Sequence, residues 1–392
     1  MDFTTVDRAG THCSKWDGLE EKFGRADILP LWVADMDLAA PQVVQDAMRK
    51  RLDHPVYGYA LYTETFYQSI MTWYQQEFAW KIEKEWIIPE HGVVVSINLA
   101  IEALSEVGDG VLIQTPVYPP FFSSIQNNNR KVLENRLVFK EGRTTIDFED
   151  FEAKAKEAKL FLLCSPHNPS TRAWNKEELE HMVEICHRHE VMIISDEIHS
   201  DLVFGASHIP TAALERAKEI TLLLHAPSKT FNIAGLNTSY LIIPNPVLRQ
   251  KYKTAHKQSG LDNGNLFGIT ALEAVYNDGK TWLEALKVHL ILNREYVKGF
   301  IEAQIPEIIV YEHDATFLMW LDCRGLELED EALAAFFIEK AGLGLNSGSS
   351  FGEAGSGFMR LNIGTGKEML EEAMTKLVSA IKAKRAQGRI DV

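Results

Sequence analysis

The chain has 392 residues, which is more than one ordinary hydrophobic core accommodates and suits a large domain with a smaller one. Its composition, 46% hydrophobic and 24% charged, is typical of a globular protein and excludes a disordered or fibrous chain. The formal net charge of −15 argues against nucleic acid or an anionic membrane surface as the main partner.

Targeting and redox features favour a cytoplasmic protein. The N-terminal residues are polar and charged, unlike a signal peptide, and no stretch approaches the eighteen apolar residues that span a bilayer. The four cysteines are scattered without a CxxC motif, which suits a reducing compartment. The spacing of His181, His187 and His189 puts no pair on one face of a helix, so we expect no metal site.

Short apolar runs alternate with amphipathic ones between residues 87 and 245. Five of these runs predict buried strands, at residues 110–114, 160–164, 191–194, 220–224 and 240–243. Residues 176–188 show helical spacing. Strands that are apolar on both faces and separated by helices indicate an α/β layer with a mostly parallel sheet.

The last hundred residues follow a different pattern. The elements predicted there are a helix, a strand and two further helices, at residues 282–303, 316–321, 330–341 and 367–383. This order indicates a separate α+β unit, completed by the N-terminal forty-odd residues. We therefore expect a large domain at residues 48–285 and a small domain formed by residues 1–47 and 286–392.

Reactive side chains follow four of the predicted strands. Tyr118 follows the first, Asn168 the second, Asp196 the third and Lys229 the fourth. Because ligands of such sheets bind at the carboxyl ends of the strands, we expect these four residues to meet in one crevice.

Lys229 and Asp196 carry the most specific chemistry. Burial of Lys229 between apolar segments would lower the pKa of its amine, which suits a nucleophile that also acts as a base. Asp196 ends an apolar strand, where a carboxylate needs a cationic partner. A pyridinium nitrogen would be such a partner and would serve as an electron sink. The alternatives are a surface lysine in a turn, and an N-cap or structural ion pair for the aspartate.

Three further residues suit a cofactor and an amino-acid substrate. Asn168 could donate its amide to a ring hydroxyl, although Asn-Pro is also a common turn. Tyr118 could stack on a pyridine ring or be a partly buried core aromatic. Arg360 lies inside an apolar run, where a guanidinium suits two-point binding of a carboxylate or a structural salt bridge.

In this order and spacing, the residues resemble the class I/II aminotransferase superfamily, the pyridoxal-phosphate (PLP) enzymes of fold type I. Within it, the chain is most similar to the cystathionine β-lyase-like C–S lyases of the MalY/PatB type. The segments that carry the resemblance are LPLWVADMD (29–37), YGY (57–59), QTPVY (114–118), DEIHSD (196–201) and APSKTFN (226–232). The resemblance implies an α/β fold with a large, mostly parallel-sheet domain and a smaller α+β domain. It also implies PLP as cofactor and a homodimer with shared active sites.

The resemblance implies a role for each residue around the cofactor ring. Lys229 would bind PLP covalently and move the Cα proton, and Asp196 would pair with the pyridine nitrogen. Asn168 would contact O3′, and Tyr118 would stack on the ring. Arg360 would bind the substrate α-carboxylate.

Other residues would hold the phosphate and the substrate. Backbone amides at Gly92, Val93 and Val94, which open a helix running to about Val107, would cradle the phosphate as helix N-termini do. Ser228 would add a hydroxyl, and Tyr59 would reach the phosphate from the neighbouring subunit. The remaining expected contacts are His199 with the cofactor, and Trp32 and Ala34, together with Asn168, with the substrate.

Three positions depart from the family pattern. His199 stands where aminotransferases usually have tyrosine, which agrees with the lyase subgroup. Asn237 stands where many relatives have arginine or lysine for the phosphate, so no cationic phosphate ligand is expected there. Thr171 replaces a frequent glycine, which leaves the local turn open.

The leading hypothesis is a β-eliminating lyase that converts L-cystathionine or a related cysteine thioether to pyruvate, ammonia and a thiol. The alternative is an aminotransferase of amino acids that uses the same residues, since about 1.4 kcal/mol between competing barriers changes the product ratio tenfold. A PLP-binding regulatory protein is a third hypothesis. Against it, every expected catalytic position is filled and no DNA-binding module is appended.

Overall fold

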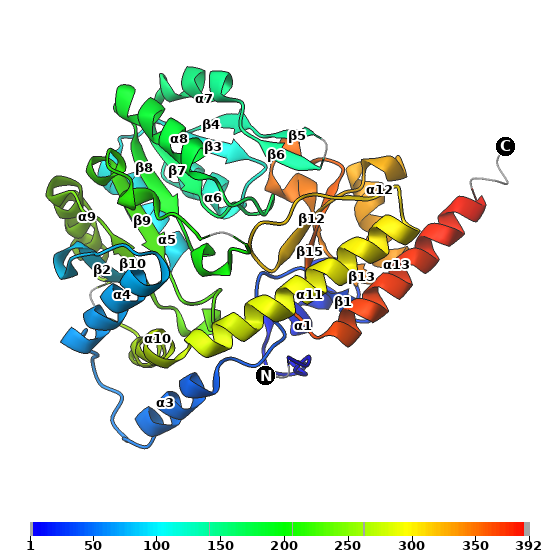
Figure 1. Cartoon of the computed structure of the whole chain (residues 1–392), viewed down its shortest axis with the longest axis horizontal. Helices are drawn as coiled ribbons and strands as arrows, with labels where there is room; N and C mark the ends of the chain where they lie inside the picture. The colour runs from blue at the N-terminus through cyan, green and yellow to red at the C-terminus, as the bar shows by residue number, and fades with distance from the viewer. Residues whose placement is uncertain (1–2, 141, 206, 262, 388–392) are drawn as a thin grey trace.

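The computed structural model describes residues 3–140, 142–205, 207–261 and 263–387. Its centre is a seven-stranded sheet with the strand order β2-β10-β9-β8-β7-β3-β4 (Figure 1). The strands are β2 (Ile87–Glu90), β3 (Gly110–Thr115), β4 (Lys131–Arg136), β7 (Ala158–Cys164), β8 (Met192–Asp196), β9 (Thr221–His225) and β10 (Ser239–Ile242). Each of the five predicted strands is present, with its ends within two residues of those predicted.

Neighbouring strands of this sheet run parallel except at β10, which is antiparallel to both β9 and β2. A parallel neighbour needs a long crossover connection, whereas an antiparallel one does not. Residues 226–238 join β9 to β10 and contain only a short 3-10 turn, Ala234–Leu236. This connection carries Lys229, so the reversal of β10 keeps the lysine at the edge where β9 ends.

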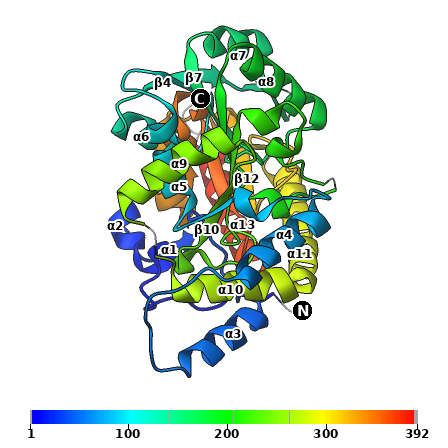
Figure 2. The same ribbon diagram turned by 90° about the vertical axis from the view of Figure 1, so that its left-hand side faces the viewer.

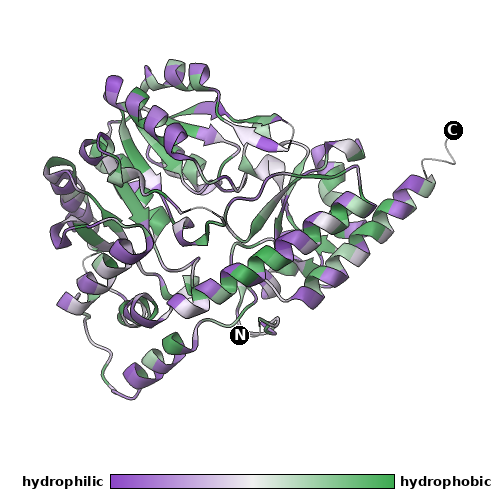
Figure 3. Cartoon of the chain, viewed as in Figure 1, coloured by the Kyte–Doolittle hydropathy of each residue, from purple (hydrophilic) through white to green (hydrophobic). Residues whose placement is uncertain are grey.

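Helices cover both faces of the sheet, which explains why its strands are apolar without alternation. In β7, Leu160 and Leu162 belong to one hydrophobic core, and Phe161 and Leu163 belong to another. Helices α5 (Val93–Leu104), α6 (Pro120–Asn127) and α9 (Pro246–Ser259) cover the first face, and α7 (Phe148–Ala155) and α8 (Lys176–Arg188) cover the second (Figure 2). The strands are apolar, while the helices carry hydrophilic residues along their outer sides (Figure 3).

Helix α8 spans the predicted residues because a capping box fixes where it starts. The side chain of Asn175 accepts a hydrogen bond from Glu178 N at 2.8 Å, and the side chain of Glu178 accepts one from Asn175 N at 2.9 Å. These two bonds satisfy backbone donors that a helix start otherwise leaves free.

A second, four-stranded antiparallel sheet has the order β11-β12-β15-β14. Its strands are β11 (Ile309–Val310), β12 (Leu318–Asp322), β14 (Asn346–Ser347) and β15 (Phe358–Asn362). The long helix α11 (Lys280–Gln304) and helix α13 (Lys367–Gln387) lie side by side against it (Figure 1). Both long helices and the strand were predicted, although β12 starts two residues later than expected because Thr316 has a left-handed backbone (φ 74°).

Part of the N-terminal segment packs with this second unit. Strand β1 (Leu29–Pro30) pairs in parallel with β13 (Leu343–Gly344). The predicted helix at 330–341 is α12 (Asp330–Ala335), followed by a π-helical turn at Phe336–Lys340. The two sheets together confirm the predicted α/β fold class with a mostly parallel sheet and a smaller α+β unit.

The division of the chain into domains stays a prediction. The expected boundaries at residues 48 and 285 fall within α3 (Gln42–Leu52) and α11.

Among the helices of the described ranges, none is both long enough and apolar enough to cross a bilayer.

Candidate active site

The carboxyl ends of β3, β7, β8 and β9 open on a cavity of about 500 Å³. Tyr118, Asn168, Asp196 and Lys229, each of which follows or ends one of these strands, all line it. A cavity of this size suits a small cofactor with its substrate. The structure therefore brings together the four residues that the strand order singles out.

Lys229 lies in the loop after β9, partly buried at the wall of the cavity. Its Nζ donates a hydrogen bond to the carbonyl oxygen of Ala34 at 2.7 Å. Burial lowers the pKa of the Lys229 amine from its usual value. A surface lysine in a turn is therefore the wrong interpretation of this residue.

Asp196 is a buried carboxylate without an ion pair to any cation in the described parts of the chain. Its Oδ1 accepts one hydrogen bond, from Ile198 N at 3.1 Å. Burial raises the pKa of Asp196 to about 7, because little compensates the ionised form. A ring nitrogen that carries a proton would supply the missing partner, so this carboxylate fits a pyridinium ring.

Arg360 reaches the cavity from β15 of the second sheet. Its Nη1 donates to Oδ1 of Asn168 at 3.0 Å, and its Nη2 donates to the carbonyl oxygen of Trp32 at 2.8 Å. Burial lowers the pKa of Arg360 to about 10. No described aspartate or glutamate forms an ion pair with it, and its Nε has no described partner. A structural salt bridge is therefore the wrong interpretation, and the guanidinium is available to a carboxylate from outside the chain.

Tyr118 connects the ends of two strands. Its backbone N–H donates to the carbonyl oxygen of Asn168 at 3.1 Å, and its ring is partly buried in the cavity wall. Burial also raises the pKa of its hydroxyl. A ring held in this way is able to stack on a flat ligand.

The other end of the cavity is formed by the start of α5. Gly92, the N-cap residue, supplies no side-chain hydrogen bond, and the first amides of a helix have no acceptor within it. Gly92, Val93 and Val94 line the cavity together with Ser228 and Asn237. These donors suit a phosphate group. The helix itself ends at Leu104, three residues before the predicted end.

His199 is buried in the cavity wall. Its ring lies edge-on to Phe317, with centroids 5.9 Å apart, and its Nδ1 has no hydrogen-bond partner among the described residues. Burial lowers the pKa of His199 to about 3, so the ring is neutral at physiological pH. An imidazole nitrogen left open inside the cavity fits a polar group of a bound ligand.

Thr171 adopts the left-handed backbone (φ 62°) that glycine takes readily. The turn after Asn168 and Pro169 therefore forms without the glycine that is frequent at this position in the family. The backbone N–H of Thr171 donates to the carbonyl oxygen of His167 at 2.8 Å. Its hydroxyl donates to the backbone carbonyl oxygen of Glu312 at 3.0 Å. The side-chain bond offsets part of the strain.

Two of the remaining predicted residues line the cavity and one does not. Trp32 and Ala34 are part of the wall. Tyr59 lies outside it and is 92% exposed, in the segment between α3 and α4 (Glu64–Glu77). Its neighbours Tyr57 and Leu61 are also exposed.

Several residues of the cavity wall were missed from the sequence: Val33, His91, Val95, Cys164, Ile198 and Asn346. His91 immediately precedes the cap of α5, and its Nε2 lies 3.2 Å from the carbonyl oxygen of Leu261. Its place next to Gly92 was the signal that could have found it. Asn346 offers no such signal, because it belongs to the second sheet.

In the part of the chain that the structure describes, no group of three or more His, Cys, Asp or Glu side chains is placed to hold a metal ion.

Comparison with known proteins defines the class to which this fold and cavity belong. The family model for aminotransferase class I and II matches residues 26–377. The chain is 39% identical to cystathionine beta-lyase PatB of Bacillus subtilis, over 96% of this chain and 98% of that protein. It is 37% identical to protein MalY of Escherichia coli, over 98% of this chain and all of that protein.

Among solved structures, cystalysin from Treponema denticola, which contains PLP, superposes with a TM-score of 0.94. It is 35% identical, and the match covers 97% of this chain and 99% of cystalysin. The chain belongs to the class I and II aminotransferase family. It is a PLP-dependent enzyme of the C–S lyase and aminotransferase class, and the expected similarity to the MalY/PatB type is confirmed.

Proposed function

We propose that this protein is a C–S β-lyase that cleaves L-cystathionine or a related cysteine thioether. The observation that carries the proposal is the cavity itself. It combines an amine made less basic by burial (Lys229) with a buried carboxylate (Asp196) that has no ion-paired cation and a buried guanidinium (Arg360) that has no ion-paired carboxylate among the described residues. Each lacks the partner that PLP or an amino acid would supply.

The proposed role of Arg360 is to bind the substrate α-carboxylate. Its Nη1 and Nη2 already bond to Asn168 and to the Trp32 carbonyl, which holds the guanidinium in one orientation. Because the guanidinium is already ordered, binding of a carboxylate costs less side-chain entropy. Trp32 and Ala34, as wall residues, exclude water from the substrate side.

The proposed roles around the cofactor follow from the same contacts. Lys229 holds PLP covalently, Asp196 keeps the ring nitrogen protonated, and Tyr118 stacks on the ring. Asn168 and His199 contact the polar edge of the ring. The first amides of α5 bind the phosphate with the Ser228 hydroxyl, and the neutral Asn237 stands in for the cation that many relatives have.

The reaction needs one base and one leaving group. Bound PLP supplies the electron sink for the electron pair of the Cα–H bond. Lys229 removes the Cα proton, for which an amine of lowered pKa is suited. The sulfur leaves from Cβ with the electrons of the C–S bond and takes up a proton. One water molecule then converts the three-carbon remainder to pyruvate and ammonium, so that thioether plus water gives thiol, pyruvate and ammonium.

The preference for elimination is supported by PatB, which bears the name cystathionine beta-lyase, and by His199 in place of the tyrosine usual in aminotransferases. The test is release of pyruvate and thiol from L-cystathionine by the holoenzyme. Equal amounts of the two products are expected, and Lys229→Ala should abolish both. Absence of both products with L-cystathionine and with L-cysteine would rule out the lyase activity.

We also propose a homodimer in which Tyr59 contacts the phosphate of the neighbouring subunit. The support is its 92% exposure in a segment where Tyr57, Leu61 and Val56 are exposed as well. Exposed apolar side chains gathered in one segment are typical of a surface that a partner covers.

A further inference from the structure

Residues 32–37 have no regular secondary structure, and the first three of them line the cavity. Every one of the six carbonyl oxygens nevertheless accepts a hydrogen bond. The donors are Arg360 Nη2 to Trp32 (2.8 Å), Asn362 Nδ2 to Val33 (2.6 Å), Lys229 Nζ to Ala34 (2.7 Å), Asn362 Nδ2 to Asp35 (2.6 Å), Asn232 Nδ2 to Met36 (2.8 Å) and Val6 N to Asp37 (2.8 Å). Lys229 is thus bound to a backbone segment whose position is fixed along its whole length.

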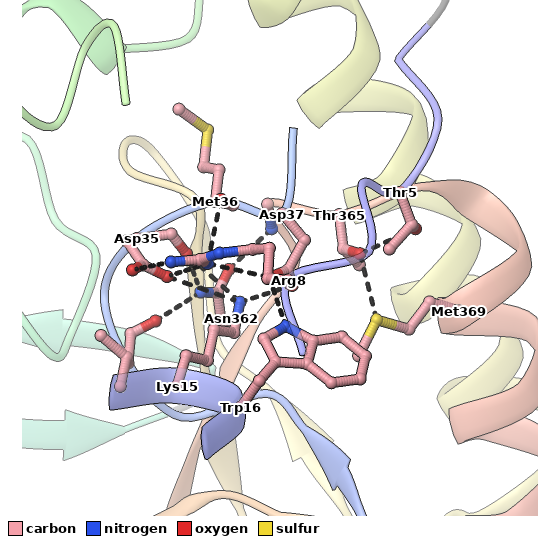
Figure 4. A network of polar contacts seen from close by, with 12 residues as sticks. Thr5, Arg8, Lys15, Trp16, Asp35, Met36, Asp37, Asn362, Thr365 and Met369 are labelled. Carbon is pink, nitrogen blue, oxygen red and sulfur yellow. Dashed lines mark hydrogen bonds and ion pairs between the residues drawn. The ribbon is translucent and has the colours of Figure 1, made fainter. Parts of the chain in front are cut away.

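The two aspartates of this segment are paired with the N-terminal residues (Figure 4). Arg8 binds Asp35 at two points, Nη1 to Oδ1 at 2.8 Å and Nη2 to Oδ2 at 2.7 Å. Asp37 is fully buried and accepts from Arg8 (3.0 Å), Lys15 (2.7 Å) and Trp16 (2.9 Å). Asp37 therefore keeps two donors if Arg8 is removed.

Asp35 depends on Arg8 to a much greater degree. Its carboxylate accepts side-chain hydrogen bonds from Arg8 alone among the described residues, and the Lys15 nitrogen is 3.9 Å away. The hydrogen bond to Asp35 raises the pKa of Arg8 well above its usual value, so the guanidinium stays ionised. Removal of the guanidinium would leave the Asp35 charge beside Ala34 with no hydrogen-bonded cation among the described residues, and with only the more distant Lys15 near it.

The Asp35 charge acts on Lys229 and raises the pKa of its amine. The bond from Lys229 to the Ala34 carbonyl places the amine next to residue 35 in the chain. The charged groups that act on the pKa of Lys229 are Asp35 and Asp196, which raise it, and Arg360, which lowers it, beside the larger lowering by burial. His199 also lies near the amine and is neutral.

We propose that Arg8 and Asp35 are positioning residues for Lys229: the pair holds the Ala34 carbonyl against the amine, and Arg8 neutralises the Asp35 charge that would otherwise keep a proton on it. The inference rests on the proposed role of Lys229 as the cofactor-binding residue. It gives the N-terminal segment a part in the protonation of the reacting nitrogen, although Arg8 does not line the cavity.

The test is a pH titration of the visible absorption of the holoenzyme, which reports protonation of the Lys229 nitrogen when PLP is bound. Four variants are compared with the wild type: Arg8→Gln, Arg8→Lys, Asp35→Asn and the double variant Arg8→Gln/Asp35→Asn. An anion that has lost its hydrogen-bonded cation favours the protonated form, so Arg8→Gln should raise the titration midpoint by roughly half a pH unit or more. Asp35→Asn should lower it. Arg8→Lys, which keeps the charge, and the double variant, which removes both charges, should stay close to the wild type.

Thermal unfolding of each variant separates this role from a structural one. A purely structural pair would lower the melting temperature in both single variants and shift the midpoint in one direction or not at all. Shifts of the same sign, or no shift, in Arg8→Gln and Asp35→Asn would overturn the inference while leaving the proposed function intact. A wild-type protein that shows no visible band after incubation with PLP would overturn the proposed function, and this inference with it.

Discussion

The guanidinium of Arg360, on β15 of the four-stranded sheet, lies 3.0 Å from the side-chain oxygen of Asn168, at the end of β7 of the seven-stranded sheet. The two residues are 192 positions apart, and their contact joins the proposed substrate end of the cavity to its cofactor end. A ligand that displaces this bond replaces an amide oxygen with a carboxylate, which is the stronger acceptor for a guanidinium.

Replacement of Arg360 by lysine should raise KM for L-cystathionine about ten- to a hundredfold, because an ammonium cannot bind a carboxylate at two points. Steady-state kinetics would measure this change. The matched control is Arg324→Lys, since Arg324 belongs to the same unit but pairs with Asp322. Equal effects of the two substitutions would mean that Arg360 acts only on folding.

Asp196→Asn should retain covalent PLP but lose most turnover, on the order of a hundredfold or more, because a neutral amide does not hold a proton on the ring nitrogen. The measurements are kcat and the fraction of Lys229 labelled after borohydride reduction. Near-normal kcat with full labelling would show that the carboxylate at the end of β8 has another role.

Without the cofactor, Asp196 has a raised pKa in the folded protein. The free energy of unfolding of the apoprotein should therefore depend on pH. In the apoprotein the folded-state pKa is about 7 and the unfolded value is about 4, so the protonated form is favoured by folding. The resulting stability is present below about pH 4 and is lost as pH rises through about 7.

Thermal unfolding of apoprotein and of apo Asp196→Asn, between pH 5 and 8, would measure this effect. The melting temperature of the wild type should fall relative to that of the variant by a few degrees as pH rises. Parallel curves would show that Asp196 does not titrate in the empty cavity.

Subunit exchange tests the proposed place of Tyr59. Mixing inactive Tyr59→Ala and Lys229→Ala dimers should restore activity, because one of the two sites of a hybrid receives both intact residues. The highest activity expected is about a quarter of that of an equal amount of wild-type protein, because about half of the dimers are hybrids and each hybrid has one intact site of two. Hybrids that form, as shown by native mass spectrometry, but remain inactive would place Tyr59 outside the neighbour's site.

The sequence predicts those parts of the fold in which burial is continuous. Strands β7 and β9 are apolar on both faces, and their sequence pattern predicts both of them. Strand β4 was missed because it is an edge strand with the sequence KVLENR, whose end residues Lys131 and Arg136 are charged and exposed. Strand β2 was missed because it has only four residues and contains a proline.

The same distinction holds for the candidate site. Residues at strand ends, such as Lys229 and Asp196, can be located from the chain order because parallel strands end at one edge. No comparable rule locates the residues that the second sheet and the N-terminal segment contribute to the cavity and its surroundings. Asn346 in the cavity wall, and the pairing of Arg8 with Asp35, depend on how the second sheet and the N-terminal segment pack, which local pattern does not encode.

The most direct test of the central claim is the product ratio in a single assay. The holoenzyme would be incubated with L-cystathionine and 2-oxoglutarate, and pyruvate and glutamate would be measured together. The lyase proposal predicts pyruvate in large excess, at least about tenfold, which corresponds to roughly 1.4 kcal/mol between the two barriers. Glutamate formed without pyruvate would contradict it and would identify the protein as an aminotransferase with the same fold and cavity.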